Sequence, residues 1–154
     1  MTHRPAARVV CLDAADRVLL LHWRDPFDGS GLWEPPGGGI DGEETPWQAA
    51  RRELAEETGL DPASVLDVSV PVERDSRWNG KRWVGTERFF VARFAVQRPE
   101  VVRTNLMPDE QATLYGHAWV ERTGLAGLPD RVEPPQLAAV VAALAPDSYW
   151  AAPG

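Results

Sequence analysis

Residues 45–59 constrain the fold of this 154-residue chain more than any other segment, because they carry the signals for both ends of a helix. Thr45 is a good N-cap, Pro46 suits the first helical position, and Thr45 and Gln48 together form a capping box. Gly59 is the residue type expected just past the last turn. The sequence therefore predicts a helix that starts after Thr45 and stops at Gly59.

The segment before this helix, residues 33–39, reads Trp-Glu-Pro-Pro-Gly-Gly-Gly and cannot be helical. Each proline lacks an amide donor, and adjacent glycines favour turns and close approaches of the backbone. We expect turns and a close approach of the backbone in this segment, which leads into the helix.

Apolar and β-branched runs predict strands in the rest of the chain. Residues 8–12 and 18–23 are expected to form a hairpin around the polar turn 13–17, followed by a loop at 25–31. Strands are also expected at 65–72, 83–96 and 117–120. The first two of these flank Asn79-Gly80, the strongest short hairpin signal in the sequence.

A second amphipathic helix is predicted near the C-terminus, because apolar residues recur there at helical spacing behind Pro134-Pro135: Leu137, Val140, Val141 and Leu144. Two helices and a mixed set of strands predict an α/β sandwich with a mixed β-sheet. We find no repeat and no linker, so residues 1–154 are expected to form a single domain with a disordered tail at 151–154.

The composition and charge of the chain disfavour some classes of binding partner. With 44% hydrophobic residues and a net charge of −7, the chain is typical of a globular protein that would be repelled by long nucleic acid and by anionic membranes. One cysteine, Cys11, excludes an internal disulfide, and the N-terminus lacks the apolar stretch of a signal peptide. We expect a cytoplasmic protein.

The predicted helix at 46–58 carries an acidic face. Glu53, Glu56 and Glu57 stand at i, i+3 and i+4, so their carboxylates project from one side and repel one another. A divalent cation would cancel this repulsion, and oxygen ligands without a Cys/His cluster favour Mg²⁺, with Mn²⁺ as a substitute, over zinc. The alternative is a solvated acidic face, which is the usual meaning of such a cluster.

The acids belong to a longer pattern, G-x5-E-x7-R-E-U-x-E-E-x-G-U, in which U is an aliphatic residue. It is formed by Gly38, Glu44, Arg52, Glu53, Leu54, Glu56, Glu57, Gly59 and Leu60. At every defined position the pattern resembles the box of the MutT-like Nudix hydrolase family. The resemblance implies a Nudix α/β/α sandwich and Mg²⁺-dependent cleavage of a diphosphate linkage in a nucleoside diphosphate joined to a group X.

The resemblance also implies roles for the residues of the box. In this family the residues that match Glu53, Glu56 and Glu57 bind the metal, and the residue that matches Glu44 supports the metal shell. The arginine that matches Arg52 orients a glutamate, and the glycine that matches Gly38 approaches the metal through its backbone. Arg52 can also reach Glu56 at i+4.

The general base that accepts the proton of the attacking water is left open by the resemblance. Glu53 or Glu57 could serve from the helix. An acid in the loop predicted at 108–111, Asp109 or Glu110, matches a region where many relatives carry one. We favour Glu110.

Recognition of the substrate is expected at the basic hairpin. Residues 71–93 hold six basic and three acidic side chains, a balance of +3 in an acidic protein. Arg77 and Arg82 could pair with phosphates while Trp78 stacks on a base. The alternative is a solvated hairpin with cross-strand aromatic contacts. Trp33 is a further candidate for the pocket, with a buried core position as its alternative.

The substrate stays open among nucleoside triphosphates, ADP-ribose, nucleotide sugars and dinucleoside polyphosphates. Ser76, Arg77 and Trp78 stand where relatives specific for ADP-ribose or dinucleoside polyphosphates often carry a proline or a tyrosine. A non-catalytic nucleotide-binding regulator, a hydrolase of RNA 5′ ends and a homodimer remain alternatives. An isoprenyl diphosphate isomerase is disfavoured, because Cys11 is poorly placed for the cysteine that such an enzyme needs.

Overall fold

The computed structural model of the chain describes residues 2–3, 5–102, 106 and 108–146, so the tail predicted at 151–154 lies outside the described residues. The strands are β1 (Thr2–His3), β2 (Ala6–Leu12), β3 (Val18–Arg24), β4 (Gly31–Glu34), β5 (Gly37–Gly39), β6 (Val65–Trp78), β7 (Lys81–Arg93), β8 (Leu114–Val120) and β9 (Arg131–Val132). The α-helices are α1 (Pro46–Thr58), α2 (Pro108–Thr113) and α3 (Leu137–Leu144), and the 3₁₀ turns are η1 (Pro62–Ser64) and η2 (Arg122–Gly127).

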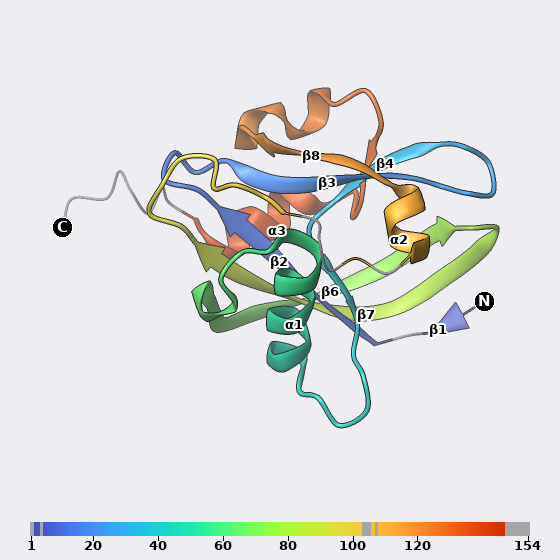
Figure 1. The fold of residues 1–154 in the computed structure, drawn as a ribbon, viewed down its shortest axis with the longest axis horizontal. Helices are drawn as coiled ribbons and strands as arrows, with labels where there is room; N and C mark the ends of the chain where they lie inside the picture. Colours follow the sequence, from blue (N-terminus) through green and yellow to red (C-terminus); the bar gives the residue numbers. More distant parts are fainter. Residues whose placement is uncertain (1, 4, 103–105, 107, 147–154) are drawn as a thin grey trace.

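The strands form one mixed sheet with β2 near its centre (Figure 1). β2 runs parallel to β7 and antiparallel to β3 and to the glycine strand β5. Among the described residues, β6 pairs with β7 alone, and β8 pairs with β3 on the other side of the sheet. The mixed sheet predicted from the sequence is confirmed.

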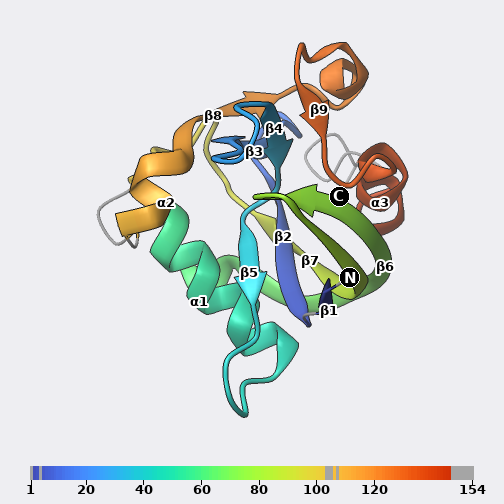
Figure 2. The same ribbon diagram turned by 90° about the vertical axis from the view of Figure 1, so that its right-hand side faces the viewer.

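Alternation of side chains along β2 divides the core into two layers. Val9 and Cys11 pack in the cluster that contains Ala50 and Leu54 of α1. Val10 and Leu12 belong to the opposite cluster, which holds the apolar face of α3. Figure 2 shows α1 and α3 on opposite sides of the sheet, which confirms the α/β/α sandwich.

α1 has the ends that the sequence predicts. The Thr45 side chain accepts a hydrogen bond from the Gln48 amide, the Gln48 side chain accepts one from the Thr45 amide, and Gly59 closes the helix in a left-handed conformation with φ of 70°. The β6–β7 hairpin turns at Asn79 and Gly80, whose φ angles of 53° and 76° fit a two-residue type I′ turn.

Several segments differ from the prediction. β6 runs on to Trp78, because its pairing with β7 continues past Pro71 up to the Asn79-Gly80 turn. Residues 108–111 belong to the helix α2 rather than to a loop, with Pro108 at the helix start and the Gln111 side chain donating to the carbonyl of Leu106. The short strand β9 follows β8, so β8 is not the last strand of the sheet.

Among the described residues, no helix has the length and apolar character needed to span a membrane.

Candidate active site

A cleft of about 730 Å³ opens between α1, the glycine strand β5, the β6–β7 hairpin and α2. Acidic residues of α1 line this cleft, and so do Arg77 and Trp78 of the hairpin. The cleft therefore joins the predicted acidic face to the predicted basic hairpin.

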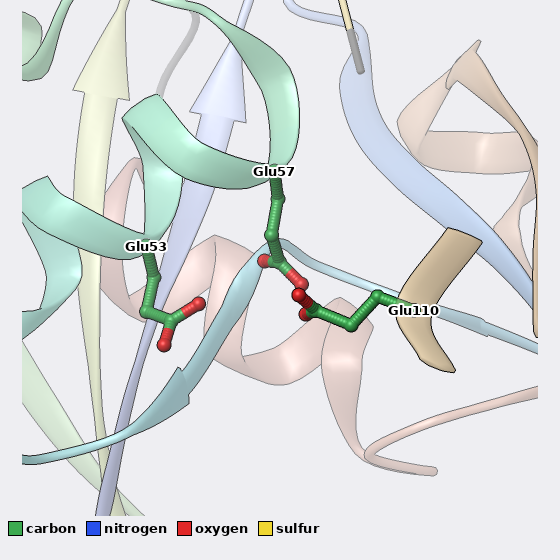
Figure 3. Close-up of side chains that lie close together, drawn as sticks. All are labelled: Glu53, Glu57 and Glu110. Atoms are coloured by element: carbon green, nitrogen blue, oxygen red, sulfur yellow. The ribbon is translucent and has the colours of Figure 1, made fainter. Parts of the chain in front are cut away.

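Three carboxylates converge in this cleft. One carboxylate oxygen each of Glu53, Glu57 and Glu110 lies within 4.8 Å of the other two. Figure 3 shows Glu53 and Glu57 extending from α1 toward Glu110, which comes from α2. The side chain of Asp109, the other acid considered as a base, lies outside the described residues.

Glu57 is the most buried carboxylate of the cluster, with 3% of its surface exposed. It accepts a hydrogen bond of 2.7 Å from the backbone amide of Gly37. Burial, together with the charge of Glu53, holds the pKa of Glu57 well above its usual value. Burial also raises the pKa of Glu53, although Arg52 opposes this shift. A nearby cation would relieve the cost of ionising both groups.

Gly38 allows the strand β5 to approach the cluster closely. A Cβ atom at this position would lie 2.7 Å from the carboxyl carbon of Glu53, which is closer than real Cβ contacts allow. A side chain would therefore fill the space that the Glu53 carboxylate now occupies. Because the cluster offers oxygen ligands beside an open cleft, its residues fit a hard divalent cation.

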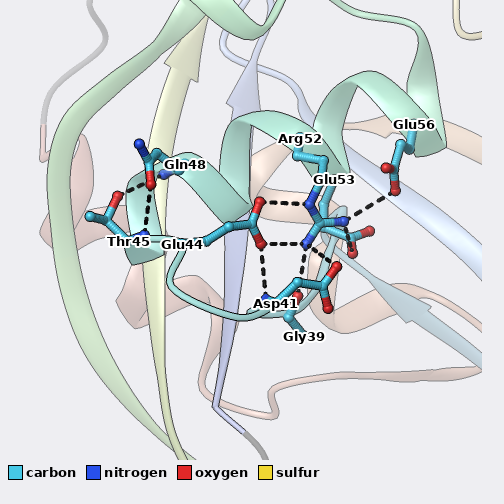
Figure 4. Close-up of polar contacts among 8 residues, drawn as sticks. All are labelled: Gly39, Asp41, Glu44, Thr45, Gln48, Arg52, Glu53 and Glu56. Carbon is cyan, nitrogen blue, oxygen red and sulfur yellow. Dashed lines mark hydrogen bonds and ion pairs between the residues drawn. The ribbon is translucent and has the colours of Figure 1, made fainter.

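Arg52 donates hydrogen bonds to several acidic residues of the box (Figure 4). Its guanidinium donates to both carboxylate oxygens of Glu44 at 2.8 and 2.9 Å, and to the carbonyl of Gly39 at 3.0 Å. It also contacts Glu53 at 3.0 Å and Glu56 at 3.3 Å. The hydrogen bonds from Arg52 lower the pKa of Glu44 to about 2, so Glu44 stays charged and anchors Arg52. The predicted reach of Arg52 to Glu56 is confirmed.

Glu56 and Glu44, unlike Glu53 and Glu57, lie outside the cluster of three carboxylates. The Glu56 side chain is 43% exposed and pairs with Arg52, outside the cluster of three carboxylates. Glu44 comes from the loop before α1 and reaches the cluster only through Arg52. All three α1 glutamates line the cleft, but Glu56 lies outside the cluster of Glu53, Glu57 and Glu110.

Of the four residues expected to bind substrate, two line the cleft and two do not. Arg77 and Trp78 line the cleft. Arg82 does not: its guanidinium forms a two-bond ion pair with Asp75 at 2.8 and 2.7 Å on the exposed face of the hairpin. Trp33 does not either, because its ring stacks on His22 at 4.0 Å and packs against the core.

A group of buried and partly buried charges that no sequence pattern predicted also lines the cleft: Arg8, Glu34, Arg74, Glu87 and Glu133. Arg8 contacts Glu34 at 3.0 Å and Glu87 at 2.9 Å, and Arg74 contacts the same two glutamates at 2.9 and 2.7 Å. Burial opposes ionisation of Glu87, but Arg8 and Arg74 outweigh it and lower the pKa of Glu87. No local pattern in the sequence marks this group, because Arg74 and Glu87 stand among other charged residues of β6 and β7.

Comparison with known proteins identifies one family. The profile of the NUDIX domain matches residues 2–141. The chain is 34% identical over 145 residues to the RNA pyrophosphohydrolase of Gluconacetobacter diazotrophicus, covering 85% of this chain and 83% of that protein. It is 30% identical over 114 residues to the RNA pyrophosphohydrolase of Azorhizobium caulinodans, covering 66% of this chain and 67% of that protein.

Solved structures share the fold. The dihydroneopterin triphosphate pyrophosphohydrolase of E. coli matches with a TM-score of 0.68 and 20% identity, covering 93% of this chain and 97% of that one. An Ap4A hydrolase of C. elegans in a binary complex matches with a TM-score of 0.65 and 22% identity, covering 91% of this chain and 96% of that one. At such identities the likeness concerns the fold alone.

Proposed function

The chain belongs to the NUDIX domain family and is a pyrophosphohydrolase. From this premise we propose that it hydrolyses a diphosphate linkage in a nucleotide, with Mg²⁺ held by Glu53 and Glu57 and with Glu110 as the general base beside them. The observation that carries the proposal is the convergence of these three carboxylates in a cleft that also holds Arg77 and Trp78. Mn²⁺ is the expected substitute, because it accepts the same oxygen ligands.

Each residue of the cluster has a distinct role in this proposal. Glu53 and Glu57 bind the cation from α1, and Gly38 leaves room for the Glu53 carboxylate. Arg52 orients Glu53 through their ion pair and keeps Glu56 beside it. Mg²⁺ bound there would polarise phosphate oxygens and acidify water. A carboxylate oxygen of Glu110 accepts the proton of the attacking water, since Glu110 faces the two α1 glutamates from the separate helix α2.

The cleft favours a small nucleotide as substrate. Trp78 offers an aromatic face for a nucleobase, and Arg77 beside it offers a cation for phosphate oxygens. The net charge of −7 opposes extended contacts along a nucleic-acid backbone. Arg82 and Trp33 have no part in this proposal, because neither lines the cleft.

A second candidate substrate is the 5′-triphosphate end of an RNA. The observation that favours it is the 34% identity to a protein named RNA pyrophosphohydrolase over 85% of this chain. The bond to be cleaved is of the same phosphoanhydride type as in a nucleoside triphosphate. Because the acidic surface limits backbone contacts, a short RNA should then serve as well as a long one.

The deciding experiment is a panel of substrates assayed with Mg²⁺, with Mn²⁺ and with chelator. The panel holds nucleoside triphosphates, ADP-ribose, nucleotide sugars, dinucleoside polyphosphates and 5′-triphosphorylated RNAs of increasing length. We expect turnover that chelator abolishes, with a small nucleotide preferred. A preference for RNA that grows with its length would overturn the small-nucleotide proposal. Tight nucleotide binding without any turnover would instead support a non-catalytic regulator.

A further inference from the structure

The loop between β3 and β4 lies against the tip of the β6–β7 hairpin, at the same end of the molecule (Figure 1). Asp25 makes this contact. One carboxylate oxygen of Asp25, Oδ1, accepts hydrogen bonds from the backbone amides of Phe27 at 2.8 Å and of Asn79 at 3.1 Å. Asp25 is 3% exposed, and its own backbone closes the loop through bonds with Gly29 and Ser30.

The backbone amide at the hairpin turn needs a hydrogen-bond acceptor outside the strand ladder. Trp78 and Lys81 form the last strand pair, so Asn79 and Gly80 are the two turn residues beyond the ladder. The Asn79 amide finds its acceptor in Asp25, and the Phe27 ring covers Gly80, where a Cβ would lie 3.2 Å from the ring. From the other side, Arg131 donates a hydrogen bond of 2.7 Å to the carbonyl of Arg77.

These contacts hold two segments that line the cleft. Pro26 follows Asp25 in the loop, and Trp78 precedes Asn79 at the tip; both line the cleft wall, as does Arg77. This wall belongs to the hairpin and the β3–β4 loop, whereas the carboxylate cluster comes from α1 and α2. A loosened tip would therefore misplace the wall and leave the carboxylate cluster intact.

We infer that Asp25 is a positioning residue, which fixes Arg77 and Trp78 against the part of the nucleotide remote from the cleaved bond. The inference rests on the proposed function. The role requires one hydrogen-bond acceptor at Oδ1 and no charge, because the bonds from the Phe27 and Asn79 amides both end on that atom. An asparagine keeps such an acceptor, and an alanine removes it.

The test compares Asp25→Ala with Asp25→Asn. Asp28→Ala is the matched control, since Asp28 accepts its bonds from Ser30 within the same loop. With the best nucleotide of the panel as substrate, Asp25→Ala should raise KM about five- to ten-fold, the effect of losing one or two hydrogen bonds. Its kcat should stay near the wild-type value, and Asp25→Asn and Asp28→Ala should both keep the wild-type KM.

Hydrogen exchange of residues 77–81 is the second measurement, because it reports on the tip even if no substrate is found. Faster exchange in Asp25→Ala alone, together with the rise in KM, supports the inference. Faster exchange with an unchanged KM overturns it while the proposed function stands. An equal rise in KM for Asp25→Asn also overturns it, because the charge would then matter rather than the acceptor. Absence of turnover by the wild-type chain would count against the proposed function instead.

Discussion

Replacing Glu57 with glutamine should remove activity and leave the fold intact. Glutamine keeps an oxygen that can accept the bond from the Gly37 amide, but it lacks the charge that a cation needs. We expect kcat/KM to fall roughly a thousand-fold or more, the scale of losing metal assistance. Glu43→Gln, an exposed position beside the box, should keep wild-type activity. Near-normal turnover in Glu57→Gln would refute the assignment.

The sign of the pKa shift at Glu57 adds a stability control for this variant. The pKa is higher in the folded chain than in the unfolded one, so the metal-free protein loses stability as pH rises from the unfolded value toward the raised folded value. Glutamine removes this loss. Metal-free Glu57→Gln should therefore be at least as stable at neutral pH as the wild type, which separates lost catalysis from lost folding.

Substitution of Gly38 tests whether metal binding needs the close approach of the β5 backbone to the cluster. In Gly38→Ala the new Cβ would meet the carboxyl group of Glu53, so that carboxylate must move. We expect the affinity for Mn²⁺, measured by calorimetry, to weaken about ten- to a hundred-fold, as when a metal ligand loses its orientation. Gly127→Ala is the control, since nothing lies within 4 Å of the added Cβ. Equal affinities for Mn²⁺ in the two variants would contradict the prediction.

Local spacing predicted the reach of Arg52 to Glu56, because residues i and i+4 meet on any helix. Spacing could not show that Arg52 also binds Glu44, or that Glu110 rather than Glu56 joins Glu53 and Glu57 in the cluster. The ion pair of Arg8 with Glu87 joins residues 79 positions apart, so no local pattern contains it. Such pairs depend on which strands become neighbours.

Asp13, in the turn between β2 and β3, should make the stability of the fold depend on pH. The Asp13 carboxylate accepts bonds from the amides of Arg98 at 2.9 Å, Arg17 at 2.8 Å and Ala15 at 3.0 Å. Burial opposes its ionisation, but these bonds outweigh burial and lower its pKa. Because the folded pKa lies below the unfolded value of about 3.9, this stabilisation is present at neutral pH and is lost as pH falls through that range.

Asp13→Asn should therefore flatten the acid end of the stability curve. At neutral pH the variant should lose about 1 to 3 kcal/mol of unfolding free energy, because an amide cannot replace all the bonds of the carboxylate. From pH 5 to pH 3 its further loss should be smaller than that of the wild type, as measured by urea unfolding. Asp67→Asn, on the exposed face of β6, should follow the wild-type curve. Parallel curves for Asp13→Asn and the wild type would contradict the prediction.

Elements with strong end signals were the ones that the sequence predicted well. α1 has a capping box and a terminal glycine, and the β6–β7 hairpin has Asn79-Gly80 at its turn. α2 was missed because six residues are too few for a helical period to appear. β9 has two residues and exists only through its pairing with β4.

The carboxylate cluster itself is a product of the whole fold. α1 packs on one face of the sheet through Ala50 and Leu54, and this places Glu53 and Glu57 at the cleft. α2 leads into β8, which pairs with β3, and so brings Glu110 to the same place from 53 residues further along the chain than Glu57. Resemblance to a family suggested Glu110 as a candidate, whereas its position beside Glu57 required the assembled sheet.

Metal binding should accordingly stabilise the whole chain, because the unfolded chain has no such cluster. At a free Mg²⁺ or Mn²⁺ concentration about a hundred times Kd, binding adds about 2.7 kcal/mol, which for a domain of this size raises Tm by roughly 5 to 10 °C. Chelator should reverse the rise, and sodium chloride at matched ionic strength should not reproduce it. Glu57→Gln should lose most of the shift, since it removes the most buried charge of the cluster. An equal rise in Tm for Glu57→Gln and the wild type would place the cation elsewhere on the molecule.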